Sequence, residues 1–205
     1  MIAVRGAGSE IAYELKKLLH RREFVAVARG EPMPLVGRYL FCTGLLRDRP
    51  KAEQTADEIR EGYDVNYRFI VAECERVLAL DENARICVIG SESAYRGSYD
   101  EAYAEAKLLL HKWVERRELG SNQQLVAISP GVIQDAGQCV RRTDRWRTEQ
   151  RRKLIPRQRF LKAYEVARLV HFALYMDEGY LTNVVIRFNG GEHTRRVYAG
   201  AIRAA

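Results

Sequence analysis

Three side chains have the types and the spacing for proton chemistry at a carbonyl or alcohol oxygen. Tyr103 and Lys107 stand four residues apart in a segment of helical periodicity, so both project from one helix face. A nearby cation lowers the pKa of a phenol, which makes Tyr103 a candidate general acid. Ser91, twelve residues earlier, follows the apolar run ICVIG and can hydrogen-bond the same oxygen. The alternatives are a chance pair among 11 tyrosines and a serine that caps a turn.

The N-terminal segment has the layout of a phosphate-binding turn. An apolar run leads into Gly6, Gly8 and Ser9, and a helical pattern that includes Ile11 follows at once. Backbone amides and a helix N-terminus in this layout can face a phosphate, although glycine turns also occur for steric reasons alone. Arg29 ends the second apolar run, where the ribose of an adenine dinucleotide would lie. Its guanidinium can pair with a 2′-phosphate there, and the alternative is a solvated arginine.

The elements that must position these residues alternate between short apolar runs and longer amphipathic stretches. This order predicts an α/β fold, a Rossmann-like doubly wound parallel sheet flanked by helices. The predicted strands are Met1 to Val4, Phe24 to Ala28, Tyr39 to Cys42, Ile86 to Ile89, Leu125 to Ile128 and Asn183 to Phe188. The predicted helices are Glu10 to His20, Ala56 to Ala79, Tyr99 to Arg117 and Ala163 to Met176, and Thr55 and Glu58 form a capping box before the second.

Composition limits the classes of protein. With 205 residues, of which 47% are hydrophobic, we expect one globular domain over residues 1–205. The net charge of +7 favours acidic or phosphorylated small molecules, and we expect no nucleic-acid partner because no interleaved aromatic module is present. The four cysteines show neither metal-ligand spacing nor a disulfide framework, so we expect reduced thiols and no metal. Without a signal peptide or a long apolar run, we expect a cytoplasmic protein that does not enter membranes.

In chain order, six segments resemble the short-chain dehydrogenase/reductase family. VRGAGSEIA resembles its nucleotide turn, LFCTGLL its Asn-Ala-Gly strand end, and TADEIREGYDVNY the helix that carries its asparagine. ICVIGSESAYRGSYDEAYAEAK resembles its serine, tyrosine and lysine segment, and VAISPGVI its Pro-Gly turn. The last segment closes on Asn189, Gly190 and Gly191, in place of the family's Asp-Gly-Gly.

The resemblance implies a catalytic tetrad of Asn66, Ser91, Tyr103 and Lys107. Tyr103 would transfer the proton, Lys107 would lower its pKa and hold the nicotinamide ribose, Ser91 would fix the substrate oxygen, and Asn66 would anchor a water. The resemblance also implies a dinucleotide cofactor and a homodimer or homotetramer assembled through the helices of the asparagine and the tyrosine. The implied cofactor-binding residues are Gly6, Gly8, Ser9, Ile11, Arg29, Gly44, Tyr103, Lys107, Pro130, Gly131 and Val132.

The sequence departs from the family pattern around the cofactor. Glu10 and Ala12 stand where the second and third glycines of the turn belong, and a carboxylate near a pyrophosphate repels it. Cys42 and Thr43 replace the Asn-Ala pair. Only GEPMPLVGRY separates the second strand from the third, so we expect this region of the sheet to be shortened and the adenine pocket to be more open.

Residues 133–162 are predicted to form a lid over the substrate. This segment is dense in basic residues, namely Arg141, Arg142, Arg145, Arg147, Arg151, Arg152 and Lys153. An anionic substrate would suit such a lid, whether a carboxylate, a phosphorylated sugar or a carrier-linked acyl group. A solvated helix face is the alternative.

We therefore predict an NADP(H)-dependent oxidoreductase that interconverts a carbonyl and a secondary alcohol on a small substrate, with NADP(H) favoured over NAD(H) because of Arg29. The alternative is a catalytically silent dinucleotide-binding or regulatory protein on the same fold, motivated by Glu10 and the shortened adenine wall.

Overall fold

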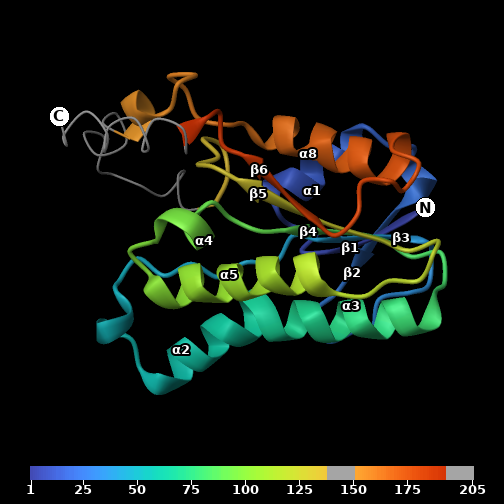
Figure 1. The fold of residues 1–205 in the computed structure, drawn as a ribbon, viewed down its shortest axis with the longest axis horizontal. Helices are drawn as coiled ribbons and strands as arrows, with labels where there is room; N and C mark the ends of the chain where they lie inside the picture. Colours follow the sequence, from blue (N-terminus) through green and yellow to red (C-terminus); the bar gives the residue numbers. More distant parts are fainter. Residues whose placement is uncertain (138–150, 193–205) are drawn as a thin grey trace.

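The sheet of the protein is parallel throughout. In a computed structural model, which describes residues 1–137 and 151–192, six strands have the order β2-β1-β3-β4-β5-β6 (Figure 1). The strands are β1 (Ile2–Arg5), β2 (Phe24–Val27), β3 (Arg38–Phe41), β4 (Arg85–Ile89), β5 (Gln124–Pro130) and β6 (Val184–Phe188). Because β1 lies between β2 and β3, the chain changes direction across the sheet there, which confirms the predicted doubly wound α/β fold.

Helices cover both faces of the sheet. The described helices are α1 (Glu10–Lys17), α2 (Ala56–Tyr63), α3 (Phe69–Leu80), α4 (Ser93–Arg96), α5 (Glu101–Arg116) and α8 (Ala163–His171). Helices α1 and α8 pack together on one face, and α2, α3 and α5 lie on the other (Figure 1). No helix within the described ranges is both apolar enough and long enough to span a bilayer.

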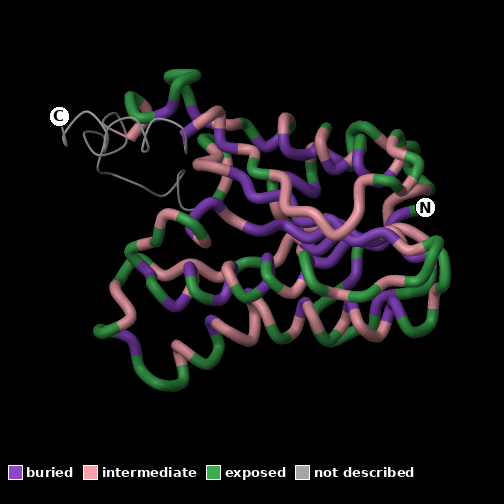
Figure 2. The backbone as a smooth tube through the Cα atoms, in the orientation of Figure 1, coloured by how far each residue is buried: buried purple, intermediate pink, exposed green. Residues whose placement is uncertain are grey.

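Alternation along the strands divides the core into two layers. Ile2, Val4 and Leu40 pack under α1 and α8, whereas Ala3 and Tyr39 pack under α3 and α5. The four inner strands, β1, β3, β4 and β5, are almost entirely buried (Figure 2), as expected for a parallel sheet covered on both faces, whereas the edge strands β2 and β6 are mostly half-buried. The sheet is therefore a rigid support for the loops at its carboxyl edge.

The long helix predicted over Ala56 to Ala79 is present but not uniform. Its N-terminus has the predicted capping box, since Thr55 Oγ1 accepts from the Glu58 amide at 3.2 Å and the Glu58 carboxylate accepts from the Thr55 amide at 2.9 Å. A π-helical turn at Asp64–Arg68 then joins α2 to α3. A second π-helical turn, Phe172–Met176, continues α8. Periodicity alone does not reveal these wider turns.

The region between β2 and β3 is shortened as predicted, because residues 28–37 contain neither a helix nor a strand. Arg5, which extends β1 one residue beyond the prediction, holds this loop. Its buried guanidinium donates to the carbonyls of Ala28 and Glu31 and lies 3.7 Å from the Glu73 carboxylate. Met33 is buried in the core from the same loop. The buried side chains of Arg5 and Met33 thus hold this short loop.

Candidate active site

The carboxyl ends of β1, β3, β4 and β5 border a cavity of about 1460 Å³. Ligands bind at this edge in open α/β sheets, near the point where the strand order reverses. Of the predicted site residues, the cavity is lined by Gly8, Ser9, Ile11, Gly44, Ser91, Tyr103, Lys107, Pro130, Gly131 and Val132. Gly6, Arg29 and Asn66 are predicted site residues that do not line it.

The turn after β1 is built for close approach of its backbone. Gly6 has a φ of +83°, and a Cβ there would lie 2.8 Å from the Cys42 carbonyl carbon, so this position requires glycine. A Cβ on Gly8 would contact nothing within 4 Å, which leaves open space above the turn. Ser9 caps α1, because its side chain accepts from the Ala12 amide at 3.2 Å. Ala12 is fully buried and therefore packs well where the family pattern has glycine.

Two charged residues lie at this end of the cavity. Glu10 is the first residue of α1, is exposed and lines the cavity. Its carboxylate favours the dipole of α1 but would repel a bound phosphate. Arg29 is exposed just beyond the end of β2, and β2 pairs with β1 up to Arg5 and Val27. Arg29 therefore lies at the same sheet edge as the turn, outside the cavity lining.

Tyr103 and Ser91 interact directly. Ser91 Oγ accepts from the Ser93 amide at 3.1 Å and hydrogen-bonds the phenol of Tyr103. Burial raises the pKa of Tyr103, while the bond from Ser91 and the charge of Arg96 lower it. The sequence predicted that Lys107 lowers this pKa. In the structure Ser91 and Arg96 lower it, and the lysine ammonium lies over the tyrosine ring, 5.9 Å from its centre.

Lys107 is 1% exposed and binds two carbonyl oxygens. Its Nζ donates to Ile89 at 2.9 Å and to Thr43 at 3.4 Å, so one of its three N–H groups is left for a ligand in the cavity. Burial lowers the pKa of Lys107 to about 8, and nearby Cys42 opposes this shift. Burial in turn raises the pKa of the Cys42 thiol to about 12.

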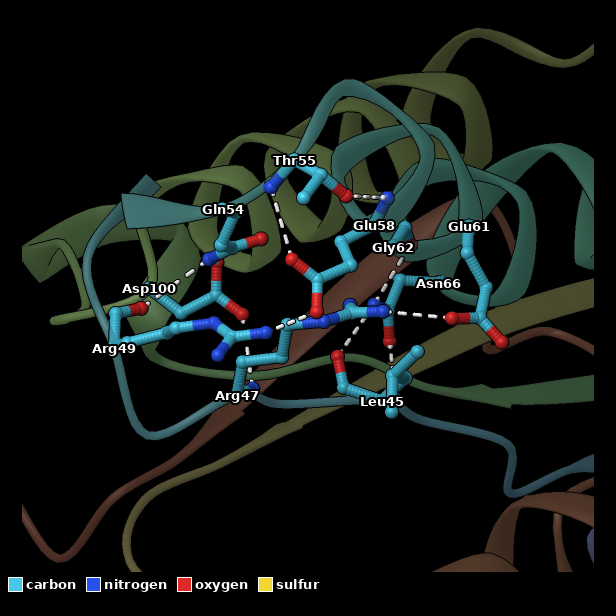
Figure 3. Close-up of polar contacts among 10 residues, drawn as sticks. All are labelled: Leu45, Arg47, Arg49, Gln54, Thr55, Glu58, Glu61, Gly62, Asn66 and Asp100. Atoms are coloured by element: carbon cyan, nitrogen blue, oxygen red, sulfur yellow. Dashed lines mark hydrogen bonds and ion pairs between the residues drawn. The ribbon is translucent and has the colours of Figure 1, made fainter. Parts of the chain in front are cut away.

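Asn66 does not line the cavity but holds one of its walls through hydrogen bonds to the main chain. Its side-chain oxygen accepts from the Leu45 amide at 2.9 Å, and its two N–H groups donate to the carbonyls of Leu45 and Gly62, each at 2.8 Å (Figure 3). Both side-chain protons are thereby used, and the residue is fully buried. Asn66 fixes the segment that follows β3, in which Thr43 and Gly44 form one wall of the cavity.

Asp100 fixes the same segment from the other side. As the N-cap of α5, its carboxylate accepts from the Tyr103 amide at 3.1 Å. It also accepts from the Arg47 amide and from the Gln54 side chain, both at 3.0 Å (Figure 3). The carboxylate is 2% exposed. One buried aspartate therefore joins the wall after β3 to the helix that carries Tyr103 and Lys107.

The Pro-Gly turn after β5 adjoins the base of the predicted lid. A Cβ on Gly131 would lie 3.2 Å from the Cα of Asn189, so the small residue lets the ends of β5 and β6 approach closely. The Gln134 amide donates to the Leu161 carbonyl at 2.8 Å, and the Leu161 amide donates to the Val132 carbonyl at 3.0 Å. These two main-chain bonds join the two ends of the predicted lid. Of its basic residues, Arg151 lines the cavity. Arg141, Arg142, Arg145 and Arg147 lie outside the described residues.

Sequence reasoning missed two ion pairs beside this site, each with a buried carboxylate. Glu92, 2% exposed, accepts from Arg187 at 2.6 Å, and it also binds Ser129 and Asn189 at 3.0 and 2.5 Å. Arg96 pairs with Glu192 at 3.1 Å, and both residues line the cavity. The partners are about 95 residues apart in sequence and share no local pattern. These ion pairs could be predicted only after the order of β4, β5 and β6 in the sheet was known.

The residues present fit a dinucleotide. The turn at Gly8 is open, the Thr43 hydroxyl is buried without a hydrogen-bond partner among the described residues, and Lys107 retains one donor. Glu10 does not fit a dinucleotide, because its carboxylate would repel the pyrophosphate. Within the described part of the chain, no three His, Cys, Asp or Glu side chains gather as a metal site would require.

Solved structures with this fold are similar in shape but distant in sequence. A structure from Brucella melitensis, described as a short-chain dehydrogenase/reductase and glucose/ribitol dehydrogenase, has a TM-score of 0.79 at 18% identity over 93% of this chain and 95% of that one. A variant of ElxO with NADPH bound has a TM-score of 0.74 at 13% identity over 94% and 98%. A structure described as ribose-5-phosphate isomerase from Brucella melitensis 16M has a TM-score of 0.81 at 20% identity over 97% and 95%.

The chain therefore has the fold of short-chain dehydrogenase/reductases, as its sequence segments predicted. No protein-family model and no curated protein matches the chain. Because proteins described by different activities share this fold, the reaction has to be argued from the side chains of the site.

Proposed function

On this fold, we propose an NADP(H)-dependent oxidoreductase of the short-chain dehydrogenase/reductase family, which interconverts a carbonyl and a secondary alcohol on a small substrate. One observation carries the proposal. Ser91, Tyr103 and Lys107 line the same cavity as the turn after β1, and Ser91 hydrogen-bonds the phenol. Proton transfer and dinucleotide binding can thus occur side by side, and NADP(H) would supply or accept the hydride.

The chain itself handles the proton. Tyr103 donates its phenolic proton to the substrate oxygen in reduction and accepts it in oxidation. When substrate binds, Ser91 turns its single O–H from the phenol to the same substrate oxygen and aligns it. Lys107 gives its remaining N–H to the nicotinamide ribose while Ile89 and Thr43 hold the ammonium. Asn66, whose side chain binds the main chain of Leu45 and Gly62, positions the segment that carries Thr43 and is proposed to anchor the water of the proton relay.

Preference for NADP(H) over NAD(H) rests on Arg29. The residue is exposed at the carboxyl edge of β2, next to the turn that would hold the pyrophosphate. A guanidinium at this place pairs with a 2′-phosphate, which only NADP(H) carries. Titrations should therefore give a lower Kd for NADPH than for NADH. A clear preference for NADH would contradict this part of the proposal.

The substrate is proposed to be anionic or linked to an acidic carrier. Arg151 lines the cavity from the predicted lid, and Arg96 lies near the phenol of Tyr103. Replacing Arg151 by Gln should raise KM for an anionic ketone more than for a neutral one, whereas Arg168→Gln, on the exposed side of α8, should change neither. An equal effect of Arg151→Gln on both ketones would contradict an anionic substrate.

The decisive experiment combines cofactor titration with a panel of ketones. We expect the wild-type protein to bind NADPH and to oxidise it with at least one ketone. Tyr103→Phe should keep the Kd for NADPH within about twofold but lower kcat by about 100-fold or more, because a general acid contributes roughly 10²–10⁴. Tyr180→Phe is the matched control, since Tyr180 is 98% exposed. Full activity of Tyr103→Phe would overturn the proposed role.

A second candidate function is a catalytically silent binding or regulatory protein. The exposed carboxylate of Glu10 at the N-terminus of α1 favours this alternative, because it opposes the charge of a pyrophosphate. Absence of binding to both NADPH and NADH would support it. Cofactor oxidation that depends on Tyr103 would exclude it.

We further propose that the chain is one domain, acts in the cytoplasm as a homo-oligomer, and binds neither nucleic acid nor membranes. Cys42, Cys74 and Cys87 are free thiols, in line with a reducing compartment, and Cys139 lies outside the described residues.

A further inference from the structure

His111 lies on the same face of α5 as Tyr103 and Lys107, one turn beyond the lysine. The imidazole is 1% exposed and does not line the cavity. Its Nε2 accepts a hydrogen bond from the main-chain amide of Ser91 at 3.4 Å. His111 therefore contacts the main chain of Ser91 from outside the cavity.

The glycine before the serine makes room for this contact. A Cβ on Gly90 would lie 2.0 Å from Nε2 of His111 and 2.9 Å from its Cδ2. Gly90 does not have a positive φ, so the position needs glycine for space and not for backbone conformation. The ring of Tyr95 also packs against the imidazole, with 5.3 Å between the ring centroids.

The contact bears on the serine side chain. Ser91 Oγ accepts from the Ser93 amide and hydrogen-bonds Tyr103. The main-chain nitrogen of Ser91 is thus bonded to His111 and its Oγ is bonded to the Ser93 amide, so both ends of the residue are held next to the phenol of Tyr103. Loss of the imidazole would leave the Ser91 amide without this acceptor and free the serine to move.

We propose that His111 is a positioning residue: its neutral imidazole, protonated at Nδ1, holds the amide of Ser91 and so keeps the serine hydroxyl on Tyr103. The catalytic consequence rests on the proposed oxidoreductase function, whereas the tautomer and the contact with Ser91 do not.

The groups around the ring keep it neutral. Burial lowers the pKa of His111 to about 4, and the neighbouring charge of Lys107 on α5 contributes. Glu92, which follows β4, opposes the shift, and Arg187 on β6 adds to it. A neutral ring retains the Nε2 lone pair that the Ser91 amide needs.

A first test needs no activity. Long-range ¹H–¹⁵N spectra of the labelled protein distinguish the two neutral tautomers and the charged form of each histidine. We expect the signal absent from His111→Gln to be an Nδ1–H tautomer that does not titrate between pH 8 and 5.5. A protonated Nε2, or a titration near pH 6.5, overturns the proposal even if the protein proves to be an oxidoreductase.

A second test uses kinetics. His111→Leu removes the acceptor at similar volume, and His111→Gln keeps one. We expect the Leu variant to lose about tenfold or more in kcat with an unchanged Kd for NADPH, and the Gln variant to recover part of the loss. Because the Ser91 bond lowers the pKa of Tyr103, the rise of kcat/KM with pH for alcohol oxidation should move to higher pH in the Leu variant. A folded Leu variant with the wild-type pH profile and kcat overturns the proposal.

A third test remains if the Leu variant does not fold. Gly90→Ala should lower the Tm of the wild-type protein because the new methyl group meets the imidazole. The same change should cost much less in a His111→Ala background. Equal losses of Tm in both backgrounds overturn the contact on which the proposal stands.

Discussion

The buried ammonium group of Lys107 makes the stability of the protein depend on pH. Its folded pKa of about 8 lies below the ordinary value of 10.5, so between these values the unfolded chain binds more protons. Stability therefore rises as the pH increases through this window, and the full cost of the buried charge is present below about pH 7.

Replacing Lys107 by Met should remove this dependence. Between pH 7 and 9.5, we expect the free energy of unfolding of the wild type to rise relative to that of the variant by about 2 kcal/mol, since one pKa unit corresponds to about 1.4 kcal/mol. Urea unfolding at both pH values measures the difference. Lys112→Met, on an exposed position of α5, is the control and should run parallel to the wild type. If the free energy of unfolding of Lys107→Met changed with pH in the same way as that of the wild type, the lowered pKa of Lys107 would not be the source of the pH dependence.

Glu10 should limit affinity for the dinucleotide. Glu10→Gln removes a negative charge from the N-terminus of α1, and we expect the Kd for NADPH to fall by about fivefold, corresponding to about 1 kcal/mol. The gain should shrink at high salt because the carboxylate is exposed. Glu82→Gln, on an exposed residue before β4, serves as the control in the same titration. Weaker binding by Glu10→Gln would show that the carboxylate assists the ligand.

Sequence patterns predict site residues that lie on the same helix or at the end of one strand. They do not predict contacts between residues that come together only when the chain folds. Tyr103 and Lys107 were predictable because four residues on a helix return to the same face. Arg5, Glu92 and His111 were not, since their partners come from other strands and loops. Ser91 was predictable through its place at the end of a strand.

Among the elements, the segment after β3 depends on two buried side chains. Asn66 and Asp100 hold it at Leu45 and Arg47, so hydrogen bonds fix its position relative to α5. Such buried polar groups are costly when one partner is lost.

Asp100→Ala should therefore affect both stability and binding. The variant loses the N-cap of α5 and the bond to the Arg47 amide, and we expect a loss of about 2 kcal/mol in the free energy of unfolding with weaker NADPH binding. Asp100→Asn, which keeps an acceptor, should lose less. Asp57→Ala removes an exposed ion pair with Arg60 and should cost less than about 0.5 kcal/mol in the same urea titration. Equal losses at positions 57 and 100 would contradict the assigned role.

The elements themselves were largely predictable. All six strands and the main helices follow from apolar runs and helical periodicity, and the short interval before Tyr39 predicted the shortened region of the sheet. The π-helical turns and the short helix α4 did not follow, because no periodic pattern marks them. The conformation of the loop between β2 and β3 was not predictable either. No pattern in the sequence near Arg5 indicates that its side chain binds the carbonyls of Ala28 and Glu31.

For the molecule as a whole, we expect assembly through the helical face that carries α3 and α5. Leu109 on α5 is 39% exposed and Leu80 at the end of α3 is 59% exposed, which leaves apolar surface on that face. Sedimentation of the wild type should give a dimer or tetramer, and Leu109→Arg should shift it to a single chain. Leu35→Arg, in the loop after β2, should not. A monomeric wild type would contradict this proposal.

The shortened sheet has a further consequence for solubility. Because no strand follows β2 on its outer side, the backbone N–H and C=O groups there are unpaired within the described sheet and could template a strand of a second copy. The edge is only four residues long, and exposed Arg21, Arg22 and Arg29 flank its two ends. Two such edges that approach each other bring like charges together. The arginine proposed to select the 2′-phosphate thus also discourages edge-to-edge aggregation.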